Sequence, residues 1–182
     1  MTGATARERI ALVLIDLQVD FGAADGAMAR RGADITAAQA AVTRAQALAE
    51  AARGARVPVV FVRLQGNQDL CAEGTHGADF IGPQPMADEM VISKTRFSAF
   101  ARTGLAEQLR AAGIDTLVLA GLTTECCVAA SAWAAFEQDF QVFIAADACA
   151  AYEEALHRQT LRALELSGAT VTSTEEIAAS WK

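Results

Sequence analysis

The chain has 182 residues, of which 53% are hydrophobic and 20% charged, and its formal net charge is −7. A chain of this length buries roughly 70% of its unfolded surface in one core and needs no disulfide or metal to fold. The acidic balance and the absence of a Lys/Arg run exclude nucleic acid and anionic membranes as expected partners, because both bind basic patches. Composition therefore predicts one globular domain over residues 1–182.

The N-terminal residues, the apolar runs and the cysteines predict the cellular compartment of the protein. The first residues, MTGATARER, precede a short strand-like run, whereas a signal peptide would continue into an apolar segment and a cleavage site. The longest apolar run, CCVAASAWAAF, is too short to cross a bilayer, which takes about 20 residues. We therefore expect a soluble, cytoplasmic protein whose four cysteines are free thiols, and no CxxC spacing indicates a metal site.

Short apolar runs alternate with segments of helical period along the chain. The runs predict six β-strands, at residues 9–16, 57–64, 90–94, 115–121, 141–147 and 169–173. The first five lack polar alternation, which is typical of strands covered on both faces. Residues 34–53 repeat apolar positions every three or four residues, which predicts a helix with one buried stripe. This alternation predicts an α/β fold of three layers, α-β-α, around a doubly wound, six-stranded parallel sheet.

Three chemically active side chains follow strands of this predicted sheet, where ligands gather in such folds. Asp16 ends the first strand, Lys94 ends the third, and GLTTECCV follows the fourth. An acid at the end of a buried strand needs a partner, because an isolated carboxylate loses its hydration. Taken by itself, Asp16 is consistent with a structural acid that caps a turn, and Lys94 is consistent with an ordinary surface lysine. Together with a cysteine they supply a base, a cation and a nucleophile.

The two adjacent cysteines differ in their predicted place on a helix. If Thr124 caps a helix that begins at Glu125, Cys127 lies in the first turn, where free N–H groups and the helix dipole favour a thiolate. Cys126 then points about 100° away. We therefore expect Cys127 to be the nucleophile, with Asp16 as the proton acceptor and Lys94 as the balancing charge.

Three motifs in this order resemble those of the isochorismatase-like cysteine hydrolases, which include nicotinamidases, N-carbamoylsarcosine amidases and ureide amidohydrolases. The stretches ALVLIDLQVDF, SKTRFSAFARTGL and GLTTECCV are similar to the family's Asp, Lys and Cys motifs, and they place its catalytic residues at Asp16, Lys94 and Cys127. The resemblance covers nearly the whole chain. It also implies a cis peptide bond between Leu122 and Thr123, and an oxyanion hole made by the N–H groups of Thr123 and Cys127.

Differences between this sequence and the family's motifs limit the reactions that we expect. Nicotinamidases hold a metal with an Asp-x-His pair and a further His after the second strand, whereas this region reads RLQGNQDLCAEGTHGADF. The chain has only His76 and His157, so we expect no metal and no cofactor, and metal-assisted nicotinamidase activity is disfavoured. True isochorismatases often lack the nucleophilic cysteine, so its presence favours amide chemistry.

The predicted reaction is cleavage of a C–N bond in a small amide, ureide or N-carbamoyl compound, through a thioester on Cys127. Two alternatives remain: a vinyl-ether hydrolase that forms no acyl-enzyme, and a non-catalytic binding protein of the same fold. A dinucleotide-dependent oxidoreductase is excluded because no GxGxxG follows the first strand.

Four further side chains are candidates for substrate binding. Phe21 and Phe97 lie beside motif residues and fit either a pocket wall or the core. Arg96 fits a substrate carboxylate or a surface acid, and His76 fits the pocket mouth or an ordinary loop position. Asp20 is expected to hydrogen-bond within the first loop. The resemblance implies a homodimer or homotetramer in which a neighbouring subunit contributes to the pocket.

Overall fold

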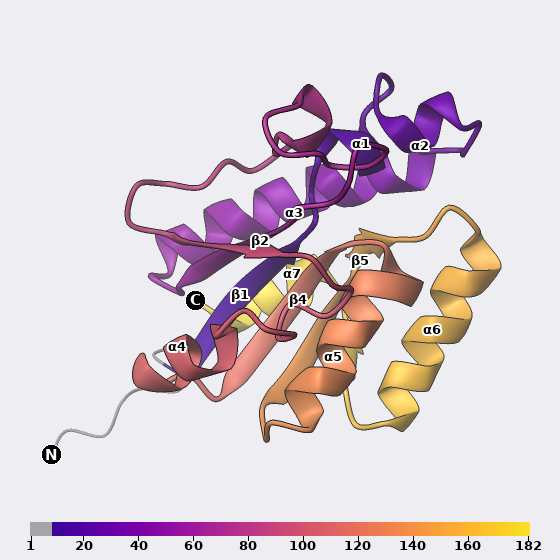
Figure 1. Ribbon diagram of the computed structural model, residues 1–182. Helices are drawn as coiled ribbons and strands as arrows, with labels where there is room; N and C mark the ends of the chain where they lie inside the picture. The colour runs from indigo at the N-terminus through magenta and orange to yellow at the C-terminus, as the bar shows by residue number, and fades with distance from the viewer. Residues whose placement is uncertain (1–8) are drawn as a thin grey trace, which may run out of the picture.

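A six-stranded parallel sheet runs through the centre of the computed structural model, which describes residues 9–182 (Figure 1). The strand order is β3-β2-β1-β4-β5-β6, and every neighbouring pair is parallel. The strands are β1 (Ile10–Ile15), β2 (Val59–Leu64), β3 (Met90–Lys94), β4 (Thr116–Leu122), β5 (Gln141–Ala150) and β6 (Thr170–Thr172). The predicted fold class and all six strands are confirmed, although β5 continues three residues further than predicted. The segment of residues 1–8, for which the sequence predicts no leader, lies outside the described residues.

Helices cover both faces of the sheet, as Figure 1 shows. One face packs against α3 (Thr36–Gly54) and α7 (Thr174–Ser180), and the other against α4 (Leu105–Ala111), α5 (Ala129–Phe136) and α6 (Glu154–Leu166). Side chains alternate between the faces along β1, so that Leu12 and Leu14 meet α3 while Val13 meets the α5 layer. Both faces of β1 are therefore buried, which explains its unbroken apolar sequence.

Short helices occupy the loops at the carboxyl end of the sheet. These are α1 (Val19–Gly22) and α2 (Ala27–Arg30) after β1, the 3-10 helix η2 (His76–Ala78) after β2, and the single π-helical turn η3 (Thr124–Val128) after β4. The predicted helix over residues 34–53 is confirmed as α3. Within residues 9–182, no helix is long and apolar enough to cross a membrane.

The winding of the chain reverses between β1 and β4, and folds of this kind bind ligands at the carboxyl ends of the strands beside such a reversal. Gly121 of β4 pairs with Ile15 of β1 at this point. Its φ of +139° lies in a region that favours glycine, and a Cβ added there would lie 2.0 Å from the Ile15 carbonyl oxygen. The absence of a side chain at Gly121 thus lets the ends of the two central strands meet.

Candidate active site

Asp16, Lys94 and Cys127 meet in one buried cluster at this carboxyl end. The Lys94 Nζ donates a hydrogen bond to Asp16 Oδ2 at 2.6 Å and lies 3.3 Å from the Cys127 Sγ. The exposed fractions of the three residues are 0%, 1% and 5%. Lys94 thus stands between the acid and the thiol, so the structure brings the three predicted catalytic residues together.

The sheet explains why these residue types reach one another. Asp16 directly follows β1, and its φ of 52° is a left-handed conformation that aspartate tolerates better than most residues. Lys94 ends β3, which is two strand positions from β1 and hence about 10 Å away. The four-carbon side chain of Lys94 therefore crosses the end of β2, where it also donates to the Arg96 carbonyl oxygen at 3.0 Å.

The turn that carries Cys127 begins one residue earlier than the sequence predicts. Thr123, not Thr124, is the residue before the turn, and it makes no side-chain cap bond. The amides of Cys126 and Val128 both donate to the Thr123 carbonyl oxygen, at 3.1 and 3.2 Å. The predicted Thr124 cap is wrong because that side chain is fully buried and bonds elsewhere. The peptide bond between Leu122 and Thr123 is cis, at the position that the resemblance implies.

Burial and charge shift the proton affinities of this cluster. Burial, and then negative charge on Cys127, raise the pKa of Asp16 well above its ordinary value, while Lys94 opposes this effect. Burial alone would lower the pKa of Lys94, but the charges of Asp16 and Cys127 raise it, so the ammonium keeps its proton. Asp16 Oδ1 is buried and has no hydrogen-bond partner among residues 9–182. The acid therefore has a free oxygen and a raised affinity for a proton.

The two neighbouring thiols have opposite shifts. The hydrogen bond with Cys126, followed by burial, raises the pKa of the Cys127 thiol, whereas the same bond lowers the pKa of the half-buried Cys126 to about 7. The direction of the Cys127 shift opposes the expected thiolate, which stays a prediction. A thiolate at Cys127 would be a second anion beside buried Asp16, and both anions would share the single ammonium of Lys94.

Two buried polar side chains tie the loops around the cluster together. The Gln18 amide donates to the carbonyl oxygens of Leu64 and Ala78, at 3.0 Å each, and accepts from the Leu64 N–H at 2.7 Å. Asp20 accepts from the N–H groups of Ala27 and Cys71, at 2.9 and 2.7 Å. The expected bond of Asp20 within the first loop is confirmed, and it extends to the second loop. Gln18 was missed, although a polar residue two positions after a buried strand is a usable signal.

A further link joins loops that are distant in sequence. The Tyr152 hydroxyl, beyond the end of β5, donates to the Phe21 carbonyl oxygen at 2.9 Å. It therefore spans the end of β4, which lies between β1 and β5. Tyr152 is the only tyrosine in the chain, but no local pattern identifies its partner.

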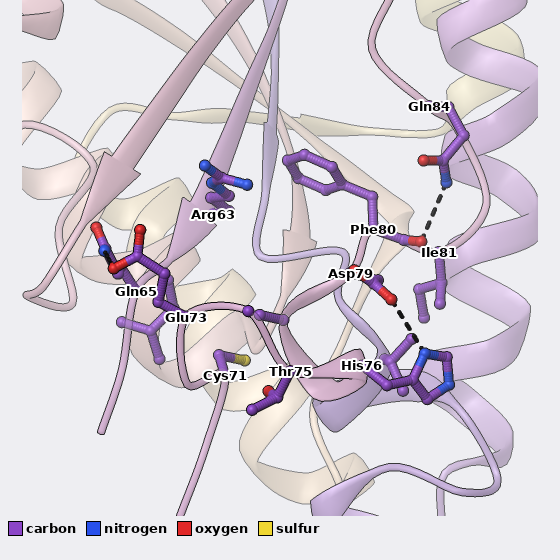
Figure 2. A pocket seen from close by; sticks show the side chains of 14 residues that line it. Arg63, Gln65, Cys71, Glu73, Thr75, His76, Asp79, Phe80, Ile81 and Gln84 are labelled. Carbon is purple, nitrogen blue, oxygen red and sulfur yellow. Dashed lines mark hydrogen bonds and ion pairs between the residues drawn. The ribbon is translucent and has the colours of Figure 1, made fainter. Parts of the chain in front are cut away.

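A cavity of about 720 Å³ lies beside the cluster, between the loops that follow β1 and β2 (Figure 2). Its wall combines apolar and polar side chains, and the polar ones include Arg63, Gln65, Glu73, His76, Asp79 and Gln84. Cys71 also lines it, and burial, followed by the charges of Asp20 and Asp16, raises the pKa of the Cys71 thiol to about 12. Cys71 thus lies close to both the cavity and the buried cluster, whose three residues are not part of the wall.

One of the four residues predicted to bind substrate lines this cavity. His76 does, and its ring nitrogens lie 3.0 Å from Asp79 Oδ2 and 3.1 Å from Asp25 Oδ2, which raise its pKa (Figure 2 shows the Asp79 contact). Phe21 does not line it, because its ring packs in the core beneath α3. Arg96 and Phe97 also lie outside the cavity wall, with exposed side chains.

Known proteins resemble this chain in sequence over most of its length. The isochorismatase domain, as a sequence family, matches residues 10–176. An uncharacterized isochorismatase family protein, YecD of Escherichia coli O157:H7, is 33% identical over 92% of this chain and 93% of its own length. Ureidoacrylate amidohydrolase RutB of Methylobacterium radiotolerans is 27% identical over 85% of this chain and 72% of its own. Phenazine biosynthesis protein PhzD1 of Pseudomonas aeruginosa is 39% identical, but the match spans 51% of this chain and 45% of that protein.

Solved structures share the fold over nearly the whole chain. An isochorismatase-like hydrolase from Alkaliphilus metalliredigens superposes with a TM-score of 0.86 at 27% identity, covering 96% of this chain and 99% of that one. N-carbamoylsarcosine amidase from Thermoplasma acidophilum has a TM-score of 0.76 at 28% identity, over 91% and 96% of the two chains. The sequence match over residues 10–176, the shared fold and the Asp-Lys-Cys cluster at the carboxyl end of the sheet place this chain in the isochorismatase family of hydrolases.

Proposed function

We propose that this protein hydrolyses a C–N bond in a small amide, ureide or N-carbamoyl compound through a thioester on Cys127. The observation that carries the proposal is the position of the Lys94 Nζ, which lies 2.6 Å from a buried carboxylate and 3.3 Å from a buried thiol. Such a cluster provides a proton acceptor, a nucleophile and a fixed positive charge in a site with little water. Relatives named as amidohydrolases support the C–N class.

The first step is attack by sulfur on the substrate carbonyl carbon. The Cys127 thiol gives its proton to Asp16, whose buried and unpartnered Oδ1 has a raised affinity for it. Lys94 remains charged throughout, so the negative charge moves from the carboxylate to the sulfur without leaving its counter-ion. The new C–S bond forms as the carbonyl electrons move to oxygen, giving a tetrahedral oxyanion.

The N–H groups of Thr123 and Cys127 are the proposed donors to this oxyanion. Both residues are buried, at 7% and 5% exposure, and within residues 9–182 the Thr123 N–H makes no hydrogen bond to another backbone group. An amide donor without a partner, held beside the nucleophile, is suited to a charge that develops only in the transition state.

The tetrahedral intermediate collapses when Asp16 returns its proton to the leaving nitrogen. The C–N bond breaks, ammonia or a small amine leaves, and a thioester remains on Cys127. Asp16 then takes a proton from water, the hydroxide oxygen attacks the thioester carbon, and the Cys127 sulfur leaves and regains a proton from Asp16. The balance is one water consumed for each amide converted to an acid and an amine.

An ammonia-release screen tests this proposal, with ureides, N-carbamoyl amino acids, nicotinamide and simple amides as candidate substrates. We expect turnover of at least one ureide or N-carbamoyl compound by the wild-type protein. Cys127→Ala should lower kcat by at least about 10³-fold, because it removes the nucleophile. The matched variant Cys126→Ala should stay within about tenfold of wild type, since its thiol is a weak hydrogen-bond donor.

Mass spectrometry of the enzyme quenched during turnover should find the acyl group on Cys127. Turnover without that adduct, or full activity of Cys127→Ala, contradicts the thioester mechanism. Hydrolysis of a vinyl ether by Cys127→Ala at the wild-type rate, with no amide cleaved by either protein, would instead establish chemistry that needs no acyl-enzyme.

A further inference from the structure

His157 is a half-buried titratable side chain that the proposed reaction does not use. It lies on α6, which packs against the turn η3 that carries Cys127. Its Nδ1 lies 2.8 Å from the Thr124 Oγ1. Thr124 is the first residue of η3 and is fully buried, so its hydroxyl needs a protein partner. Among the hydrogen bonds of the described residues, His157 is the partner of that hydroxyl.

The direction of this bond follows from the environment of the ring. Burial lowers the pKa of His157, although the carboxylates of Glu125 and Glu154 oppose that effect. A neutral imidazole has one ring nitrogen free to accept. The Thr124 hydroxyl then donates to Nδ1, and the bond joins α6 to the turn across 33 residues of sequence.

Two other side-chain hydrogen-bond systems at the turn involve Thr123 and Ser131. Thr123 Oγ1 donates to Glu125 Oε1 at 2.9 Å, within the turn. Ser131 Oγ donates to the Cys127 carbonyl oxygen at 2.6 Å and accepts from the Ala99 N–H at 2.9 Å. The His157–Thr124 bond therefore fixes the start of the turn, while Ser131 fixes its middle.

We propose that His157 is a positioning residue that acts through Thr124 to hold the N–H groups of the turn in place for the oxyanion. The inference rests on the proposed function, because it concerns the proposed oxyanion donors at Thr123 and Cys127. A shift of a turn that binds charge only in the transition state lowers kcat and leaves KM unchanged. A residue that serves folding alone would change the fraction of active protein but not the kinetics of the folded molecules.

Paired substitutions at both ends of the bond test this role. Thr124→Val removes the hydroxyl at nearly constant shape, and His157→Leu removes the ring nitrogens. Each should lower kcat roughly three- to tenfold at unchanged KM, which corresponds to the net loss of one hydrogen bond. Thr124→Ser and His157→Asn keep a polar atom near the same place and should stay within about twofold of wild type.

The double variant and a control on the same helix complete the experiment. Thr124→Val combined with His157→Leu should be no slower than the slower single variant, because one bond is lost in each case. Gln159→Leu adds a leucine at an exposed position of α6 and should leave kcat unchanged. The concentration of active protein is measured by titrating the Cys127 thiol, and kcat is calculated from that concentration. Multiplicative losses in the double variant, or equal losses in His157→Asn and His157→Leu, overturn the proposal.

A substrate-independent measurement separates this inference from the proposed function. The rate of Cys127 alkylation by iodoacetamide, followed by mass spectrometry, reports the position of the thiol relative to Lys94 without any turnover. We expect His157→Leu to change that rate at least threefold and Gln159→Leu to leave it unchanged. If no amide is a substrate but the alkylation rate shifts, the proposed function fails and the positioning role stands. An unchanged rate in His157→Leu, with kcat also unchanged, refutes the positioning role.

Discussion

At the scale of single residues, Lys94 decides the chemistry of the cluster. Its ammonium is buried with one carboxylate and one thiol, and a buried cation is tolerated only when it is paired and hydrogen-bonded. One positive charge can balance one negative charge at a time. In the proposed mechanism the proton therefore resides on Cys127 when Asp16 is ionised, and it moves to Asp16 when the sulfur becomes the anion.

Because Asp16 and Cys127 share one proton in this mechanism, activity is predicted to depend on pH. Asp16 must be ionised to accept the proton of Cys127, and its pKa is raised above the ordinary value of 3.8 by burial and by Cys127. Activity should accordingly be lost as pH falls through a value clearly above 3.8, while the protein remains folded. The measurement is kcat/KM against pH, with circular dichroism over the same range. An acid limb centred at or below 3.8 would show that a group other than Asp16 accepts the proton.

At the scale of elements, the contact between β1 and β4 holds the two halves of the site together. Asp16 follows β1 and the Cys127 turn follows β4, so their separation depends on the pairing of Ile15 with Gly121. That pairing requires a residue without a side chain, because a Cβ on Gly121 would overlap the Ile15 carbonyl oxygen.

Gly121→Ala should lower the free energy of unfolding by about 3 kcal/mol or more, since it adds backbone strain to a steric overlap. Gly113→Ala is a matched control, because Gly113 also has a positive φ (+78°) but a Cβ there would meet nothing within 4 Å. The control should lose only about 1–2 kcal/mol from conformational strain. Urea unfolding measures both values, and equal losses would mean that the β1–β4 contact tolerates a methyl group.

At the scale of the whole molecule, apolar side chains remain exposed near the outer strand β3. Met86, Val91 and Phe97 are 53%, 41% and 66% exposed. Apolar surface beside an edge strand is a common feature of subunit contacts. We propose that the protein forms a homodimer or homotetramer, as its resemblance to the isochorismatase-like hydrolases implies.

Light scattering after size-exclusion chromatography should therefore give a mass of two or four chains at micromolar concentration. Phe97→Ser should weaken the assembly at least tenfold in dissociation constant, because burial of a phenylalanine stabilises a contact by about 1.5–3 kcal/mol. A monomer at every concentration would contradict the assembly. A stable oligomer that Phe97→Ser leaves intact would place the contact on another surface.

The polar residues around the site were hard to predict, because their partners are distant in the sequence. Gln18 bonds to Leu64 and Ala78, and Tyr152 bonds to Phe21 across 131 positions. Neither set of hydrogen bonds produces a recognisable pattern in the local sequence. Phe21, Arg96 and Phe97 are neighbours of the motif residues but do not line the cavity, whereas His76, from the loop after β2, does. Nearness along the chain does not fix the direction in which a side chain points.

The strands, the parallel sheet and the placement of Asp16, Lys94 and Cys127 at strand ends could be predicted from the sequence. These depend on local hydrophobic period and on strand ends, which a linear chain displays directly. Only the folded chain shows that Lys94 crosses β2 to lie between the acid and the thiol, and that the Thr124 hydroxyl meets the His157 ring. Proton affinity and hydrogen bonding depend on burial and on distances between elements, which exist only after the helices pack on the sheet.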